Sequence, residues 1–318
     1  MPSVTDRTLP DAGSVGAGSR GRFRWRGRPW RDYVLFLVIV GPNLALLGVF
    51  TYRPLIENIR LSFYDWNISS DTIRFLGVDN YVEWFTRDDT RTIVANTVIF
   101  TVAAVLGSMA VGLALALLLD RALRGRNLVR SIVFAPFVIS GAAIGIAFQF
   151  VFDPNFGLIR DLMHRLGLGT PPDFYQDPHW ALFMITVTYL WKNVGYAFVI
   201  YLAALQGRRD DLAEAASIDG ASSWTYFRRV LLPQLRPTTY FLSITVMLNS
   251  LQVFDIINVM TRGGPLGTGT TTMVYQVYEE SFVNFRAGYG ATVATVMFVV
   301  LLVVTVAQVR TMDRGRDA

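Results

Sequence analysis

Long apolar segments separated by shorter polar ones run through most of the chain. A helix that crosses a membrane needs about 20 mostly apolar residues. Six segments meet this requirement: residues 33–52, 93–119, 131–152, 180–205, 238–260 and 289–309. The third contains Pro136 and Gly141, and the fifth is the most polar; such interruptions are tolerated where neighbouring helices satisfy the freed backbone groups. The pattern predicts an all-α membrane protein with six transmembrane helices.

The composition agrees with a membrane protein. The chain has 318 residues, of which 52% are hydrophobic and 17% charged, whereas soluble domains carry about 25% charged residues. We expect a basic cytoplasmic tail over residues 1–32, a transmembrane domain over 33–310 with a cytoplasmic loop at 206–237, and a second tail at 311–318. The absence of cysteine excludes thiol catalysis. With only two histidines besides, an intramembrane enzyme is disfavoured.

The arginines predict the orientation. If the N-terminus is cytoplasmic, the four inner segments carry 19 arginines and the three outer segments carry nine. Cytoplasmic loops are enriched in Lys and Arg, so we expect both termini inside, in a multi-pass protein of a bacterial cytoplasmic membrane. The basic, aromatic stretch 23–30 suits contact with membrane lipid. The sequence pI near 9.6 is explained by these loops, so we expect no nucleic-acid partner.

The loop 206–237 has the pattern of two short helices. Asp210 or Asp211 can cap the first helix, and Gly220 stops it. Ser222 or Ser223 then begins a second helix, which Pro233 ends. Taken alone, the pattern also fits a plain helical hairpin or a DNA-reading helix-turn-helix.

The fixed positions in this loop resemble a family signature. Glu214-Ala215-Ala216, then Gly220, then Val230-Leu231-Leu232-Pro233 are similar to the EAA signature of ABC importer permeases, with Val in place of the usual Ile. The resemblance implies a MetI-like fold and an ATPase-coupling loop. The coupling residues it implies are Glu214, Ala215, Ala216, Asp219, Gly220, Ser222, Trp224, Phe227 and Pro233.

The resemblance also implies partners. These are a second homologous permease subunit, two ATPase subunits and an extracytoplasmic solute-binding protein. A P-loop needs a Gly-Lys-Ser/Thr sequence, and the single lysine, Lys192, follows Trp191. We therefore expect no enzyme activity and no cofactor in this chain, with ATP and Mg bound by the separate ATPase.

Further stretches look like those of sugar-type permeases related to the maltose permease. They include Tyr52-Arg53-Pro54, Phe152-Asp153-Pro154 and Arg262-Gly263-Gly264-Pro265. The order of segments is similar to the A-type subunits of glycerol-3-phosphate and glycerophosphodiester importers, so we expect a solute of that class. The alternatives are a neutral di- or oligosaccharide permease and, more remotely, an ion-coupled secondary transporter.

Polar residues within the spans are candidates for the solute pathway. Such residues are costly in a bilayer and tend to face a cavity or one another. The candidates are Asn249, Gln252 and Asp255 in the fifth span and Lys192, Asn193 and Tyr196 in the fourth. Asn96 and Gln149 add polar groups to the second and third spans. Two other interpretations stay open: the amides bond between helices, and Lys192 has a structural or gating role or pairs with Asp255.

Overall fold

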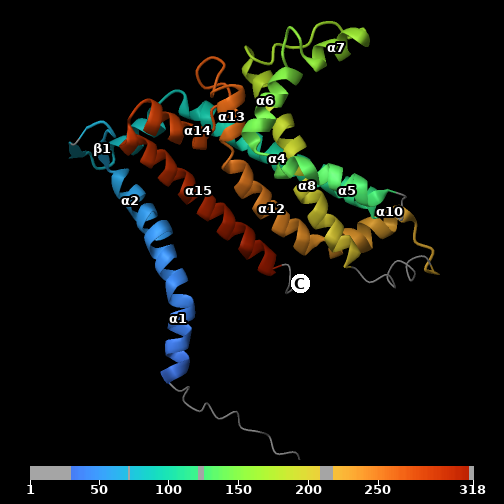
Figure 1. Cartoon of the computed structure of the whole chain (residues 1–318), viewed down its shortest axis with the longest axis horizontal. Coiled ribbons are helices and arrows are strands. Elements are labelled where there is room, and N and C mark those ends of the chain that lie inside the picture. The colour runs from blue at the N-terminus through green and yellow to red at the C-terminus, as the bar shows by residue number, and fades with distance from the viewer. Residues whose placement is uncertain (1–29, 71, 121–124, 208–217, 315–318) are drawn as a thin grey trace, which may run out of the picture. The chain divides into compact units, whose positions relative to one another are not determined.

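The computed structural model describes residues 30–70, 72–120, 125–207 and 218–314 (Figure 1). The chain divides into two compact units, residues 1–54 and 55–318. In the first unit, α1 (Trp30–Leu47) continues into a π-helical turn, η1 (Gly48–Tyr52). Pro42 lies inside α1. Of the predicted tails at 1–32 and 311–318, residues 1–29 and 315–318 lie outside the described residues.

The second unit is built on four long apolar helices. These are α4 (Thr90–Leu119), α8 (Pro178–Gln206), α12 (Arg236–Leu251) with its continuation α13 (Asp255–Met260), and α15 (Ala287–Arg314). Together with the helical segment Tyr33–Leu61, five helices in the described chain are long and apolar enough to cross a membrane. The number becomes six if one bent helix pair is counted as a span, in agreement with the six predicted segments.

The bent pair is the predicted third span. It consists of α5 (Arg126–Val138) and α6 (Gly141–Val151), which meet at 102°. The chain turns at Ile139 and Ser140, which are both extended, and the Ser140 hydroxyl accepts a hydrogen bond from the amide of Ala143. This side-chain cap satisfies one of the free N–H groups of the new helix, so the break is a defined corner.

Small residues lie at the most extensive helix contact, which joins α4 and α8. A Cβ atom built at Gly112 would lie 2.8 Å from the Cβ of Ala197, and one at Gly107 would meet the side chain of Leu190. Replacing these glycines would push the two helices apart. Small residues serve this purpose at helix interfaces in membranes, and the seam holds α8 in place as one wall of the site described below.

Short elements gather at one end of the second unit. They are α2 (Arg53–Leu61), β1 (Tyr64–Trp66), β2 (Ile73–Phe75), α3 (Asp79–Thr86), α7 (Leu158–Arg165), α14 (Met273–Tyr278) and η3 (Glu279–Val283). The two strands pair antiparallel, with Tyr64 opposite Phe75 and Trp66 opposite Ile73. The chain is therefore helical with one small β-hairpin, which the all-α prediction lacked.

The opposite end carries the described part of the loop 206–237. Gly220 has φ +70°, which confirms the predicted stop after a helical residue at Ile218. The second helix starts as predicted, with α10 (Ser223–Tyr226), but continues through η2 (Phe227–Leu231) and α11 (Leu232–Gln234). The prediction that Pro233 ends it was therefore wrong by one residue. Because a proline lacks an N–H, it fits next to the π-helical turn, where the regular hydrogen-bond ladder is already interrupted.

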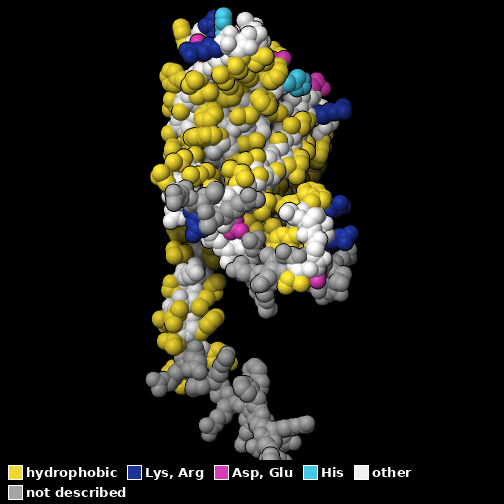
Figure 2. Space-filling model, turned by 90° about the vertical axis from the view of Figure 1, so that its right-hand side faces the viewer, with side chains coloured by type: hydrophobic (Ala, Val, Ile, Leu, Met, Phe, Trp, Pro, Cys, Tyr) yellow, Lys and Arg dark blue, Asp and Glu magenta, His cyan; other side chains and the backbone are white. Residues whose placement is uncertain are grey.

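The surface of the second unit is largely apolar between its ends. Figure 2 shows hydrophobic side chains over most of the face in view, with Lys and Arg mainly above and below them. Large exposed side chains on the long helices include Leu106 and Leu118 on α4 and Leu302 and Val303 on α15. In water such an area would be a large exposed apolar patch, so the surface fits a bilayer.

Candidate functional site

A small polar cavity lies between α8 and the junction of α12 and α13. It has a volume of about 140 Å³. The lining residues are Tyr189, Lys192 and Asn193 from α8, Asn249 from α12, Gln252 and Val253 from the junction, and Asp255 and Ile256 from α13. Five of the six residues predicted for the solute pathway thus come together at one place. Their role in transport stays a prediction.

The sixth predicted residue, Tyr196, lies one helical turn away from the cavity lining. Its ring stacks on Phe137 of α5, with ring centroids 5.2 Å apart and an interplanar angle of 21°. It therefore packs between α8 and α5 in this structure.

Tyr189 is the most unusual member of the cavity. Its side chain is buried, at 4% exposure, yet its hydroxyl has no hydrogen-bond partner among the described residues. Buried hydroxyl groups almost always have a partner, and leaving one unpaired costs about 1–3 kcal/mol. The sequence showed Tyr189 only as one aromatic residue among several. Its free hydroxyl depends on the packing of three helices, which no sequence pattern specifies.

Lys192 sits at the midpoint of α8 and contacts the end of α5. Its Nζ donates a hydrogen bond to the carbonyl of Phe137 at 3.2 Å and lies 5.3 Å from the centre of the Phe137 ring. The carbonyl ends of a helix carry partial negative charge, so the ammonium group is well placed there. Both Lys192 and Asp255 are described, and they form no ion pair. The interpretation that they pair with each other is not supported by this geometry.

Asp255 lies at the start of α6, on the other side of the corner. A Cβ atom built at Gly141 would overlap its carboxylate, so the carboxylate rests against the first residue of that helix. Helix N-termini carry partial positive charge. The carboxylate also accepts a hydrogen bond from the amide of Ile256 at 2.9 Å. The corner between α5 and α6 is thus flanked by one cation and one anion, each at the helix end of opposite partial charge.

The polar groups predicted in the second and third spans have structural partners. Gln149 donates to the carbonyl of Val259 at 2.7 Å, which fastens α6 to α13. Asn96 is buried and donates to the carbonyls of Thr268 and Gly269 at 2.9 and 3.1 Å. Neither residue lines the cavity, and both side-chain amides are bonded to backbone carbonyls. Their place in the solute pathway stays a prediction.

The candidate coupling loop is only partly described. Glu214, Ala215 and Ala216 lie outside the described residues. Asp219 and Gly220 form the turn before α10, and Ser222 caps that helix by accepting a hydrogen bond from the amide of Thr225 at 3.2 Å.

Two aromatic side chains on this segment face different surroundings. Trp224 is 67% exposed, while its neighbour Phe227 packs against a buried cluster that includes Leu205 and Leu231. The two rings stack with centroids 5.5 Å apart. Phe227 thus anchors the segment, and Trp224 remains available at its surface.

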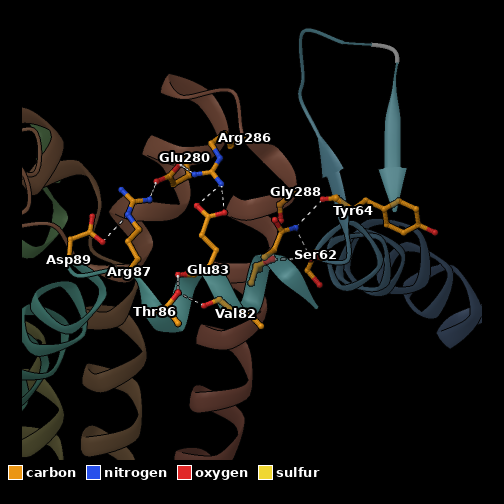
Figure 3. A network of polar contacts seen from close by, with 12 residues as sticks. Ser62, Tyr64, Val82, Glu83, Thr86, Arg87, Asp89, Glu280, Arg286 and Gly288 are labelled. Carbon is orange, nitrogen blue, oxygen red and sulfur yellow. Dashed lines mark hydrogen bonds and ion pairs between the residues drawn. The ribbon is translucent and has the colours of Figure 1, made fainter. Parts of the chain in front are cut away.

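A network of charges holds the other end together (Figure 3). Arg87 contacts the buried carboxylate of Glu280 at 2.6 Å and Asp89 at 2.9 Å. Arg286 binds Glu83 at 2.6 Å. The network joins the segment around α3 to the segment after α14. This network was not predicted from the sequence, because its partners are far apart along the chain.

The pKa values of two groups in this network are shifted. Burial lowers the pKa of Arg87, but the hydrogen bond to Glu280 and the negative charges of Glu280 and Asp89 outweigh this effect and raise the pKa overall. Burial and the neighbouring Glu280 carboxylate raise the pKa of Glu279. Glu279 is therefore easier to protonate than a free glutamate.

The chain matches a known family over most of its length. Residues 108–317 match the model of the family described as binding-protein-dependent transport system inner membrane component. The chain therefore belongs to this family of membrane permeases, whose members are transport components rather than enzymes. This confirms the permease family expected from the loop signature.

Three relatives place the chain within the family. It is 30% identical over 282 residues to the sn-glycerol-3-phosphate transport system permease protein UgpA of Agrobacterium fabrum, covering 88% of this chain and 95% of that protein. It is 33% identical over 285 residues to the probable starch degradation products transport system permease protein AmyD of Thermoanaerobacterium thermosulfurigenes, covering 88% and 94%. A crystal structure of a bacterial ABC transporter that imports alginate has a chain with a TM-score of 0.77 and 23% identity, covering 90% and 96%. The chain thus has the fold of that transporter's membrane chain.

Proposed function

We propose that this chain forms half of the translocation pathway of an ABC importer for a sugar-like solute, and that the cavity beside Tyr189 is part of this pathway. The buried, unpaired hydroxyl of Tyr189 is the observation that carries the proposal. A hydroxylated solute would supply the missing hydrogen-bond partner. The amides of Asn193, Asn249 and Gln252 at the same cavity offer further donors and acceptors.

The first candidate solute is glycerol-3-phosphate or a glycerophosphodiester. The 30% identity to a glycerol-3-phosphate permease supports this class. The second candidate is a neutral di- or oligosaccharide, which the relative named for starch degradation products favours. Lys192 does not decide between them, since its ammonium group already bonds the Phe137 carbonyl.

The proposed machine has further parts. A second homologous permease completes the pathway, two ATPase subunits bind ATP and Mg, and a solute-binding protein delivers the solute. We propose that both termini are cytoplasmic and that the α10 segment, with its exposed Trp224, binds an ATPase. Closure of the ATPases moves the 206–237 loop and opens the cavity to the outside; hydrolysis returns it.

An uptake experiment tests the pathway. Gln252→Leu and Asn249→Leu should each reduce uptake of the transported solute while the protein level in the membrane stays the same. Asn258→Leu is the matched control, because Asn258 lies on α13 outside the cavity lining. Unchanged uptake in both cavity variants would remove this cavity from the pathway.

The solute class is tested separately. Purified binding protein from the same importer is titrated with sn-glycerol-3-phosphate and with maltotriose in a calorimeter. Binding of only the neutral sugar would overturn the first candidate and leave the second.

A further inference from the structure

A second and larger cavity lies on the side of the helix bundle, away from the polar one. Its volume is about 590 Å³, which is within the range of about 300–1,000 Å³ typical of ligand sites. Its walls are the first half of α4, the end of α12 and the middle of α15, and α3 closes one end. We call it the lateral groove.

The lining of the lateral groove is almost entirely hydrophobic. Apart from two arginines and three threonines, every lining residue is apolar, including Val98, Val102 and Val300. The hydroxyl of Thr90 donates to the carbonyl of Trp84 and that of Thr97 to the carbonyl of Ile93, while the buried hydroxyl of Thr101 has no partner among the described residues. A polyol in this groove would leave most of its several hydroxyls unpaired, so the groove does not suit the transported solute.

The groove has the length of one membrane leaflet. Along α4 its lining runs from Thr90 to Val102, which at 1.5 Å per residue is about 18 Å. Half of a bilayer hydrocarbon core is about 15 Å. The three wall helices are all long and apolar enough to span a membrane. The groove therefore lies along the acyl chains of a single leaflet.

The mouth of the groove carries a free cation. Arg91 is exposed and has no hydrogen bond or ion pair with any residue in the described part of the chain. Its neighbour Arg87 is already bound to Glu280 and Asp89. A guanidinium group binds phosphate through paired, charge-assisted hydrogen bonds.

A transmembrane helix of another subunit is a less suitable occupant. Such a helix would cross the full core of about 30 Å, nearly twice the length of the groove, and would pack best on small residues. The small residues Gly107 and Gly112 of α4 face α8 instead. An unpaired arginine at the mouth has no role in such a contact.

We propose that the lateral groove binds one acyl chain of an anionic phospholipid, with the lipid phosphate on Arg91. This site is independent of the solute pathway, since it shares no lining residue with the polar cavity.

Native mass spectrometry of the full chain purified from membranes tests the proposal. The protein is offered phosphatidylglycerol and phosphatidylcholine of equal chain length at equal concentration. We expect one phosphatidylglycerol to be retained preferentially. Arg91→Ala should lower its retention by roughly threefold to tenfold, because a charge-assisted contact is lost, and Val98→Phe should lower the retention of both lipids by filling the groove.

Two matched variants serve as controls. Val111→Phe changes the same residue type on α4 outside the groove, where Val111 is 47% exposed. Arg74→Ala removes an exposed arginine on β2. Both should retain phosphatidylglycerol like the unaltered chain. Equal retention by all variants would overturn the proposal.

The assembled importer provides a second test, because another subunit can compete with lipid. A single cysteine is introduced as Val98→Cys into the otherwise cysteine-free chain and spin-labelled. Contact of the label with spin-labelled phosphatidylglycerol in the assembled importer supports the lipid site. Loss of this contact on assembly would show that a partner helix covers the groove, and would overturn the proposed lipid site.

Discussion

The carboxylate of Asp255 rests against the first residue of α6, Gly141, so closely that any side chain at position 141 would overlap it. The contact joins α13 to the corner between α5 and α6. Together with the Lys192 bond to the end of α5, it fixes a helix break beside the polar cavity.

Gly141→Ala tests this contact directly. The new methyl group must displace the carboxylate or push α13 from α6, and overpacking of this kind costs about 1–3 kcal/mol. We expect a lower thermal unfolding midpoint and reduced uptake. Gly41→Ala is the control, because nothing lies within 4 Å of a Cβ at that position. If both variants unfold alike, the contact does not hold the corner.

Lys192→Met separates a structural role from solute binding. If Lys192 stabilises the end of α5, its loss should cost about 1 kcal/mol and lower the maximal uptake rate, with the KM for solute nearly unchanged. Lys192→Arg should restore part of the rate, since it keeps the charge and donors. A large rise in KM confined to an anionic solute would instead indicate direct binding.

Tyr189→Phe should uncouple stability from transport. Removing an unpaired hydroxyl leaves the stability unchanged or slightly higher, whereas the loss of a solute contact raises KM. Tyr201→Phe, on the same helix, should behave oppositely. Its hydroxyl bonds Thr239 at 3.2 Å, so its removal should lower stability by about 0.5–1.5 kcal/mol with KM unaltered. Thermal unfolding and uptake kinetics of both variants provide the measurement.

Glu280→Gln should lower the free energy of unfolding far more than Glu57→Gln. Glu280 is 2% exposed and holds Arg87, and losing one partner of a buried ion pair costs about 3–5 kcal/mol. Since a third of the Arg87 side chain is exposed, we expect about 2 kcal/mol after allowing for solvent screening. The pair of Glu57 with Arg60 has the same length, 2.6 Å, but is about half exposed, so solvent screens it and its loss should change the stability little. Equal effects would contradict the assigned burial.

Glu279→Gln should change how stability depends on pH. Burial and Glu280 raise the pKa of Glu279 in the folded state, so the folded protein binds this proton more tightly than the unfolded chain. Its contribution to stability is then fully present below the unfolded pKa, near about 4.3, and is lost as pH rises through the folded pKa. The variant should lack this loss, so its unfolding midpoint relative to the unaltered chain should rise between acidic and neutral pH. A constant difference across this range would contradict the shift.

The spans could be predicted because each is a continuous run of apolar residues in the sequence. These runs predicted α4, α8 and α15, and the polar residues of the fifth span predicted one wall of the cavity. The 102° corner between α5 and α6 was not predictable, because Pro136 and Gly141 show only that an interruption is tolerated. Its position depends on the contacts of Lys192 and Asp255 with helix ends that come from other parts of the chain.

The hairpin β1–β2 was missed for a similar reason. The apolar spacing of residues 56–66 favours one continuous helix, but α2 ends at Leu61 and Tyr64 begins a strand. Asn80 donates to the carbonyls of Ser62 and Tyr64 at 3.0 and 3.1 Å. A side chain from α3 therefore satisfies backbone groups that a helix would have used, and local propensity is overridden.

The network around Arg87 has a consequence for biosynthesis. Arg87 and Glu280 are 193 positions apart, and at about 5–20 residues per second a ribosome needs about 10–40 s to travel that distance. During this interval the nascent chain holds a cation without its buried counter-charge. The ion pair at the β1–β2 end can form only after Glu280 has been made, so a chain that stops before residue 280 leaves Arg87 without this partner. A protease that recognises this unpaired state would therefore remove chains that stop before residue 280.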